Sequence, residues 1–326
     1  MTAASSPAFY IARRLALGLV TLFLVSALVF VATEVLPGDA ARAVLGRAAN
    51  AKALEAMREQ MHLNGPVLLR YGRWLADFCA GDFGVSLVNG QPVAHLIAAR
   101  IANSAVLLGL AGLIGAPLAI AAGIAAALHR NRALDGVLNV LTLILAALPE
   151  FVVGIGLIVI FATVVVQWLP PVSMVAPGQS VLARPEILVL PVVTLVLVTF
   201  PYMFRMMRAT MSEVLDSDYM EMATLKGLSR WRLVAVHALP NAIAPTIQVA
   251  ALTFAYLAGG TVMVEYVFGF AGIGQGLMNA IEARDIPVIQ VIVLLLAAFY
   301  VLLNIAADVA SILVTPRLRV GAWRHA

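Results

Sequence analysis

Charge is scarce in this sequence. Only 12% of its 326 residues are charged and 62% are hydrophobic, whereas soluble domains are about 25% charged and about 45–50% apolar. The excess apolar surface must lie against lipid, which excludes an ordinary soluble domain. Cysteine is scarcer still, because the single Cys79 excludes any disulfide within the chain. We therefore expect a membrane protein whose fold needs no covalent cross-link.

Lysine occurs only as Lys52 and Lys226, and neither stands in the Gly-x4-Gly-Lys-Ser/Thr pattern of a phosphate-binding loop. The chain therefore cannot supply the phosphate-binding lysine of a P-loop ATPase. The histidines are scattered and have no cysteine partner nearby, so the sequence predicts no metal site. They are His62, His95, His129, His237 and His325. No nucleophile or acid–base pair emerges either, so we expect no enzymatic activity and no catalytic residue.

Six apolar runs, each near or above the roughly 20 residues that a bilayer requires, predict an all-α polytopic membrane protein with six transmembrane helices. They cover residues 15–32, 104–128, 137–168, 187–207, 243–264 and 287–314. The first run follows Arg13 and Arg14 but is longer than the apolar core of a signal peptide. The third run is too long for a straight span and contains Pro149. Pro191, Pro201 and Pro245 similarly predict kinks or ends.

The basic residues predict the orientation of these helices. The net charge of +4 is spread over short loops and is not interleaved with aromatic residues, so we expect no nucleic-acid partner. The two short outside loops hold only Arg184 and Arg284, against twelve basic residues inside, which predicts both termini in the cytoplasm. The twelve are Arg13, Arg14, Arg130, Arg132, Arg205, Arg208, Lys226, Arg230, Arg232, Arg317, Arg319 and Arg324.

A dense cluster of charge lies between the fourth and fifth apolar runs, in residues 217–245. Asp218 followed by Glu221 predicts a capping box that opens a helix of about eight residues. Lys226 would lie in its last turn, and Gly227 can adopt the left-handed conformation that ends it. Ser229 is placed to cap a second short helix that stops before Pro240. The sequence thus predicts a short helix on a glycine hinge at the membrane surface.

This loop resembles the "EAA" loop of ABC-importer permeases, which reads Glu-Ala-Ala, three residues, Gly, nine residues, then Ile-x-Leu-Pro. Five residues match in register, whereas Met222 and His237 depart from the pattern. In the peptide and nickel branch of the family, however, His is common at the position of His237. The matching residues are Glu221, Ala223, Gly227, Leu239 and Pro240. The resemblance implies that the loop docks into an ATPase subunit. The alternative is an ordinary amphipathic helix at the membrane interface.

Other landmarks extend the resemblance to the dipeptide, oligopeptide and nickel permeases of the first-permease type. Residues 34–103 carry Leu36-Pro37-Gly38-Asp39, a helical piece around 52–62, Arg70–Leu75, and Gly81-Asp82-Phe83-Gly84, which we interpret as a turn that stops a helix. Residues 264–276 predict a bent or re-entrant outer segment. Its matches to the family are Glu265, Phe268, Gly272 and Gly274, and Arg284, Asp285 and Pro287 match downstream of it. Near the end, Asn304, Asp308 and Pro316-Arg317 match, while Thr315 replaces the usual Asp.

The resemblance implies three regions and a set of partners. The regions are 1–100 (first helix and external domain), 101–314 (type I permease core with a coupling loop at 209–242) and 315–326 (cytoplasmic tail). The implied partners are a second homologous permease, two ATP-binding cassette subunits, an extracytoplasmic solute-binding protein and membrane lipid, all at a bacterial cytoplasmic membrane. ATP and Mg²⁺ would be bound by the ATPase subunits, so this chain would hold no cofactor.

Within the apolar runs, Glu150 follows Pro149, and a charge at the bilayer centre costs about 2.5–3.5 kcal/mol on insertion scales. Glu150 would either line a translocation path or make a hydrogen bond between helices. Asp308 shares a helix face with Asn304, which favours helix-to-helix bonding. A stripe of four methionines predicts packing or adaptable cavity lining. It consists of Met203, Met206, Met207 and Met211.

The sequence is consistent with three functions. The first is the pore-forming subunit of an ATP-driven importer, in which Asp218 opens the docking helix, Glu221 is its anchor or cap, Ala223 its close-packing point and Gly227 its turn. The second is an ion-coupled secondary transporter with Glu150 as the proton site. The third is a membrane-embedded enzyme or an assembly factor. The coupling loop favours the first. Overall resemblance favours peptides as cargo, without distinguishing dipeptides, longer peptides, glutathione or nickel chelates, or an identical from a related partner permease.

Overall fold

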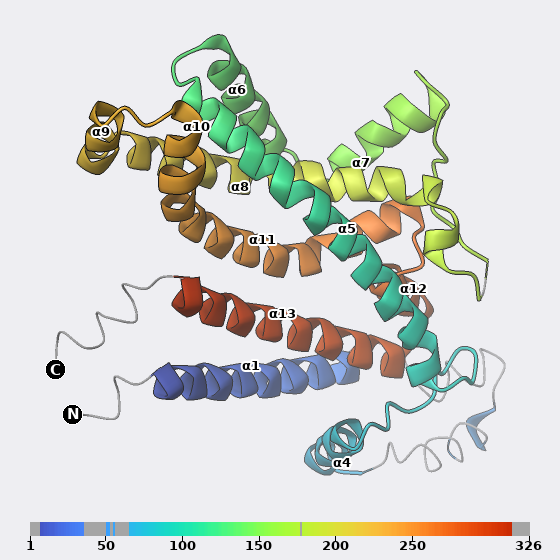
Figure 1. The fold of residues 1–326 in the computed structure, drawn as a ribbon. Coiled ribbons are helices and arrows are strands. Elements are labelled where there is room, and N and C mark those ends of the chain that lie inside the picture. The colour runs from blue at the N-terminus through green and yellow to red at the C-terminus, as the bar shows by residue number, and fades with distance from the viewer. Residues whose placement is uncertain (1–6, 36–49, 53–54, 56–64, 177, 315–326) are drawn as a thin grey trace.

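A computed structural model describes residues 7–35, 50–52, 55, 65–176 and 178–314, and these residues are helical almost throughout (Figure 1). The only β-pairing in these ranges is a single bridge between Val85 and Pro92. The α-helices are α1 Pro7–Val35, α4 Val67–Cys79, α5 Val93–Leu128, α6 Ala133–Ala147, α7 Glu150–Ile158, α8 Glu186–Leu215, α9 Asp218–Leu225, α10 Arg230–Arg232, α11 Leu239–Phe268, α12 Ile273–Ala283 and α13 Ile286–Val314. Two π-helical segments, Val159–Thr163 and Leu233–Ala238, and a 3-10 turn, Val181–Ala183, complete the set.

Five helices are long and apolar enough to cross a membrane, and a bent pair of helices supplies a sixth span if it is counted as one. The predicted all-α membrane fold is therefore confirmed. The second span is longer than its apolar run, because α5 already begins at Val93. α8 is the most buried of the spans, and α5, α6, α7 and α11 pack against it.

The third span is broken at Pro149. Leu148 is extended and Pro149 starts a new helix, so that α6 and α7 meet at 106°. The cause is local, because proline lacks an N–H and disfavours helical conformation in the residue before it. The helical part ends at Thr163, so the predicted continuation to Trp168 is wrong. Pro191, Pro201 and Pro245, by contrast, lie inside α8 and α11.

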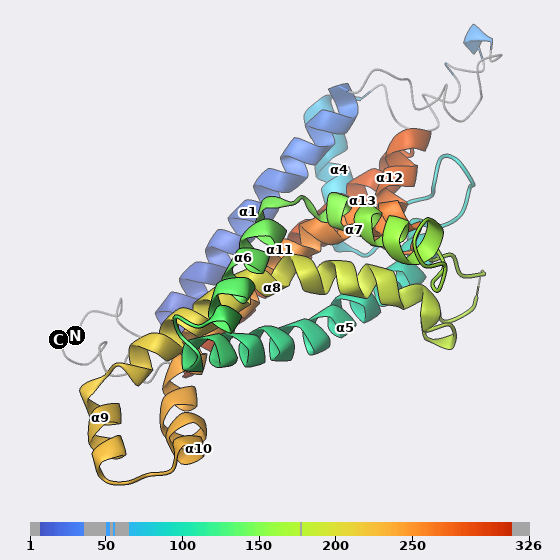
Figure 2. The same ribbon diagram turned by 90° about the horizontal axis from the view of Figure 1, so that it is seen from above.

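Small residues let α5 approach α8 closely, and the two helices lie side by side in both ribbon views (Figures 1 and 2). Gly115, Ala119 and Gly123 follow one another at four-residue spacing and are buried. A Cβ at Gly123 would lie only 2.8 Å from the Cβ of Met207 and 3.0 Å from the carbonyl oxygen of Phe204. Such small-residue stripes are typical of membrane helix pairs, where backbones must come close to gain packing.

The terminal helices α1 and α13 pack against each other. A Cβ at Gly18 would lie 2.7 Å from a methyl group of Val301, and Gln290 donates a hydrogen bond to Thr33 over 2.8 Å. Arg14 pairs with Asp308 at 3.0 Å, which confirms Asp308 as a link between helices. Asn304 instead donates to the Tyr300 carbonyl of its own helix. The start of α1 and the end of α13 lie at the end of the molecule that carries α9 (Figure 1).

The opposite end carries α4. A row of edge-on and tilted ring contacts there runs from Phe30 of α1 through Tyr71, Trp74 and Phe78 of α4 to Phe83. The Gly81–Gly84 segment ends α4 as predicted, since both glycines have positive φ and Asp82 accepts a hydrogen bond from the Gly84 amide. Residues 36–49, most of the predicted helical piece at 52–62, and the tail 315–326 lie outside the described residues.

Candidate coupling loop and outer cavity

The predicted docking helix exists as α9, eight residues long as expected, but it does not begin with a capping box. Ser217 and not Asp218 precedes the first helical residue, and no side-chain bond caps the helix. The Ser217 hydroxyl donates to the Val214 carbonyl at 2.5 Å, turned back towards α8. Asp218 and Glu221 both point into solvent. The predicted cap was wrong because the helix begins so soon after α8 that the Ser217 hydroxyl is already engaged there.

Gly227 ends α9 in the predicted left-handed conformation, with φ of 76°. Its amide donates to the Thr224 carbonyl at 2.9 Å, and the next amide, of Leu228, donates to Ala223. These bonds satisfy carbonyls that the end of a helix leaves open. Lys226 is the last residue before the glycine and lies just beyond the final helical turn. The turn prediction is confirmed.

The second short helix does not stop before Pro240. Ser229 precedes α10 without a side-chain cap, and the chain continues through the π-helical segment Leu233–Ala238 directly into α11. Pro240 lies in the first turn of α11, directly after the π-helical segment, where it removes one N–H donor without ending the helix. The fifth span is thus one continuous helical element that starts at the coupling loop.

One face of α9 is anchored and the other is open. Met220 is buried, and Ala223 packs beside it against a cluster from α8, the π-helical segment and α11. Leu239 packs against the same cluster. The opposite face exposes Asp218, Glu221 and two large apolar side chains, Met222 and Leu225, of which Leu225 is 75% exposed. The structure therefore brings Ala223 and Leu239 together inside and leaves Asp218, Glu221, Gly227 and Pro240 outside.

Glu150 opens α7 at the break of the third span. Its side chain is half-buried and lies over α11, where a Cβ at Gly260 would be 3.2 Å from the Glu150 Oε1 atom. Its carboxylate also lies within electrostatic range of Tyr256 on α11. Among the described residues, the Glu150 side chain makes no hydrogen bond or ion pair.

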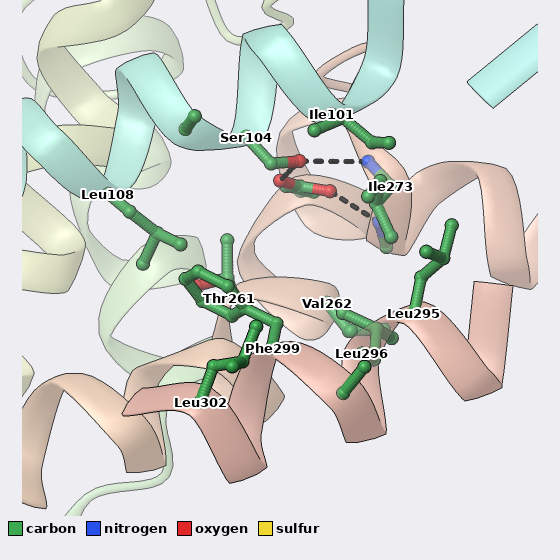
Figure 3. A pocket seen from close by; sticks show the side chains of 14 residues that line it. Ile101, Ser104, Leu108, Thr261, Val262, Ile273, Leu295, Leu296, Phe299 and Leu302 are labelled. Carbon is green, nitrogen blue, oxygen red and sulfur yellow. Dashed lines mark hydrogen bonds between the residues drawn. The ribbon is translucent and has the colours of Figure 1, made fainter. Parts of the chain in front are cut away.

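A second candidate region is an apolar cavity of about 270 Å³ between α5, α11, α12 and α13 (Figure 3). At its polar corner, Ser104 donates to Glu265 at 2.5 Å, and the Gly274 amide donates to the other carboxylate oxygen at 2.6 Å. The Ile273 amide donates to the Ser104 hydroxyl at 2.9 Å. Glu265 is only 1% exposed. Because its carboxylate accepts the hydrogen bond of the Gly274 amide, it caps the start of α12. Glu150 does not line this cavity.

Comparison with known proteins identifies the family to which the chain belongs. Residues 119–320 match the family described as the inner membrane component of binding-protein-dependent transport systems. Residues 8–107 match the N-terminal membrane component of such systems. The chain belongs to this family.

Curated relatives match the permease along almost their whole length. A probable peptide ABC transporter permease of Sinorhizobium fredii is 34% identical over 310 residues, covering 95% of this chain and 99% of the relative. The glutathione transport system permease proteins of Escherichia coli and Shigella flexneri are each 36% identical over 312 residues, covering 95% of this chain and 98% of the relative. The protein is therefore an ABC transporter permease, a multi-pass inner-membrane protein, and no finding favours the ion-coupled alternative.

Sequence reasoning missed two buried charges of the permease. Asp135 of α6, 4% exposed, receives two hydrogen bonds from Arg208 of α8. In the sequence, Glu265 stood out only as a match to the pattern of the permease family, and not as the cap of α12. The signal in both cases was an acidic residue at the edge of an apolar run, but the partners lie 73 and 161 positions away. The described residues hold no group of His, Cys, Asp or Glu suited to a metal ion.

Proposed function

We propose that the permease forms the translocation path of an ATP-driven importer of di- or oligopeptides, and that its coupling loop, through residues 218–240, docks on separate ATPase subunits. One observation carries this proposal. α9 is fixed to the membrane helices by Met220 and Ala223, yet it presents Glu221, Met222 and Leu225 outward at one end of the molecule. An exposed patch of charged and large apolar side chains on a rigid helix is suited to a protein partner.

The remaining partners follow from this assignment. The complex would contain a second homologous permease, two ATP-binding cassette subunits that hold ATP and Mg²⁺, and an extracytoplasmic solute-binding protein. The start of α1 and the end of α13 share the end of the molecule with α9, which supports both termini on the cytoplasmic side. The Glu150 carboxylate, half-buried at the α6–α7 break, is proposed as a polar wall of the translocation path.

The cargo assignment rests on the relatives. One is named for peptides and others for glutathione, which is itself a short peptide. Transport should be tested in proteoliposomes that contain the two permeases and the ATPases, with the binding protein added outside. Uptake of labelled di- and tripeptides that requires internal ATP would support the proposal. Uptake driven by a proton gradient without ATP would contradict it.

A further inference from the structure

The first half of the third span is held to the rest of the molecule in an unusual way. Only two residues of α6, Asp135 and Thr142, are buried. Its large apolar side chains are mostly exposed, including Val137, Val140 and Leu143. Apolar packing therefore supplies little of the attachment between α6 and the helices behind it.

Two arginines of α8 supply that attachment. Arg208 donates from Nε to Asp135 Oδ1 at 2.5 Å and from Nη2 to Oδ2 at 2.7 Å. Arg205, three residues earlier on the same helix face, reaches the Thr142 carbonyl at 3.5 Å. A bidentate arginine–carboxylate pair fixes direction as well as distance, because both groups are planar and matched.

The Asp135 carboxylate is also fixed from its own side. Asn139 donates to its Oδ1 at 2.7 Å, and the Asn131 amide donates to its Oδ2 at 3.2 Å. Four hydrogen bonds thus converge on a carboxylate that is 4% exposed. Removing one partner of such a buried pair leaves the other charge without compensation.

The C-terminal ends of both helices explain why this link matters. α8 ends at Leu215, two residues before α9, so its last turns carry the coupling loop. α6 ends at Ala147, directly before the break at Pro149 and the Glu150 carboxylate. α7 beyond the break packs into the core through Val153 and Gly154. Because α7 packs against α11 as well as α8, a displacement of the last turns of α8 relative to α11 that carries α6 along would change the angle between α6 and α7.

We propose that Arg208 and Asp135 are a positioning pair that makes α6 move with the coupling loop and so passes its displacement to the break at Pro149. This inference rests on the proposed function, because it needs an ATPase that moves α9. It makes the third span an element that transmits the displacement of the coupling loop.

The test uses the assembled transporter in proteoliposomes and measures peptide uptake per ATP hydrolysed. Asp135→Asn should lower this ratio at least about fivefold, in the range typical of coupling between sites, while ATP hydrolysis continues. Arg208→Lys should give an intermediate loss, since lysine cannot make the bidentate pair. The matched control is Glu186→Gln, which breaks the exposed Arg184–Glu186 pair of 2.9 Å at the other end of α8, outside the coupling loop, and should stay within about twofold of wild type.

The outcomes separate this inference from the proposed function. If the wild-type complex does not couple ATP to uptake, the proposed function fails. If the wild type couples and Asp135→Asn couples equally well, only the positioning pair is overturned. A loss in Glu186→Gln as large as in Asp135→Asn would also overturn it, because any ion pair of α8 would then suffice.

A distance measurement decides the matter even if Asp135→Asn does not assemble. Spin labels at Val140 on α6 and Glu213 on α8, both exposed, are placed in a Cys79→Ser background of the wild-type complex. ATP should leave the Val140–Glu213 distance unchanged while the distance from Glu213 to a label at Leu302 on α13 changes. A change between Val140 and Glu213, or no change in either pair, would overturn the proposal.

Discussion

Gly227 is required for its backbone conformation and not for space. No heavy atom lies within 4 Å of the position that a Cβ would occupy there, but φ is 76°. A side chain in the left-handed region costs about 1–2 kcal/mol, and β-branching restricts the residue further. Gly227→Val should therefore disrupt the end of α9 and abolish ATP-driven uptake in proteoliposomes, while the protein still inserts into the membrane. Full uptake by this variant would contradict the role of the turn.

Gly227→Asn is the matched control for that experiment. Asparagine tolerates the left-handed region several-fold better than other side chains, and the open space around Gly227 accommodates it. We expect this variant to keep most of the uptake that Gly227→Val loses, which would assign the loss to the backbone and not to added bulk.

A substitution at Glu150 distinguishes ATP-driven transport from ion-coupled transport. Its side chain makes no hydrogen bond or ion pair to any described residue, and glutamine keeps its size and polarity. Glu150→Gln should therefore retain most ATP-driven uptake in proteoliposomes, with Glu186→Gln at the exposed start of α8 as control. Complete loss of uptake in Glu150→Gln alone would indicate a proton site and favour an ion-coupled mechanism.

At the scale of elements, the start of α12 depends on a glycine that Glu265 covers. A Cβ at Gly272 would lie 2.3 Å from the Glu265 carboxylate, although φ of −102° is open to any residue. Gly272→Ala should therefore cost about 1–3 kcal/mol through overpacking. The expected result is a lower thermal unfolding temperature in detergent.

The control for this prediction is Gly259→Ala in α11, because no heavy atom lies within 4 Å of its Cβ position. This variant should unfold at or above the wild-type temperature, since alanine favours helix over glycine. Equal destabilisation of both variants would show that the Glu265 contact is not the cause.

Elements with a strong local signal were predictable from the sequence. The apolar runs identified the spans, Pro149 identified the break, and Gly227 identified the end of α9. Pro240 misled because proline removes one N–H donor but does not always end a helix. The predicted helix stop was wrong, since the π-helical segment Leu233–Ala238 continues directly into α11 past Pro240.

The buried polar contacts were not predictable. Asp135 with Arg208 and Ser104 with Glu265 each join residues that only the packed helices bring together. Ser217 occupies the N-cap position of α9 but does not cap the helix, because its hydroxyl bonds back to α8. Local propensity cannot predict such tertiary contacts, whereas it predicts the breaks and turns that proline and glycine cause.

At the scale of the whole molecule, the proposed topology has α9 and Cys79 on opposite sides of the membrane. Cys79 is exposed and is the last residue of α4, which lies at the end of the molecule away from α9 (Figure 1). A membrane-impermeant maleimide should label Cys79 in intact spheroplasts. In a Cys79→Ser background, a Lys226→Cys variant should be labelled only after permeabilisation. The reverse pattern would invert the proposed topology.

The central claim is that α9 docks this permease onto ATPase subunits. The most direct measurement is affinity purification of the tagged permease from its native membrane in mild detergent, followed by mass spectrometry. We expect a second permease and P-loop ATPases to co-purify with wild type, Glu221→Lys to lose the ATPases but keep the second permease, and Glu213→Lys at the exposed end of α8 to keep both. If the wild-type permease came out alone, or if Glu221→Lys retained its ATPases unchanged, the account would be contradicted.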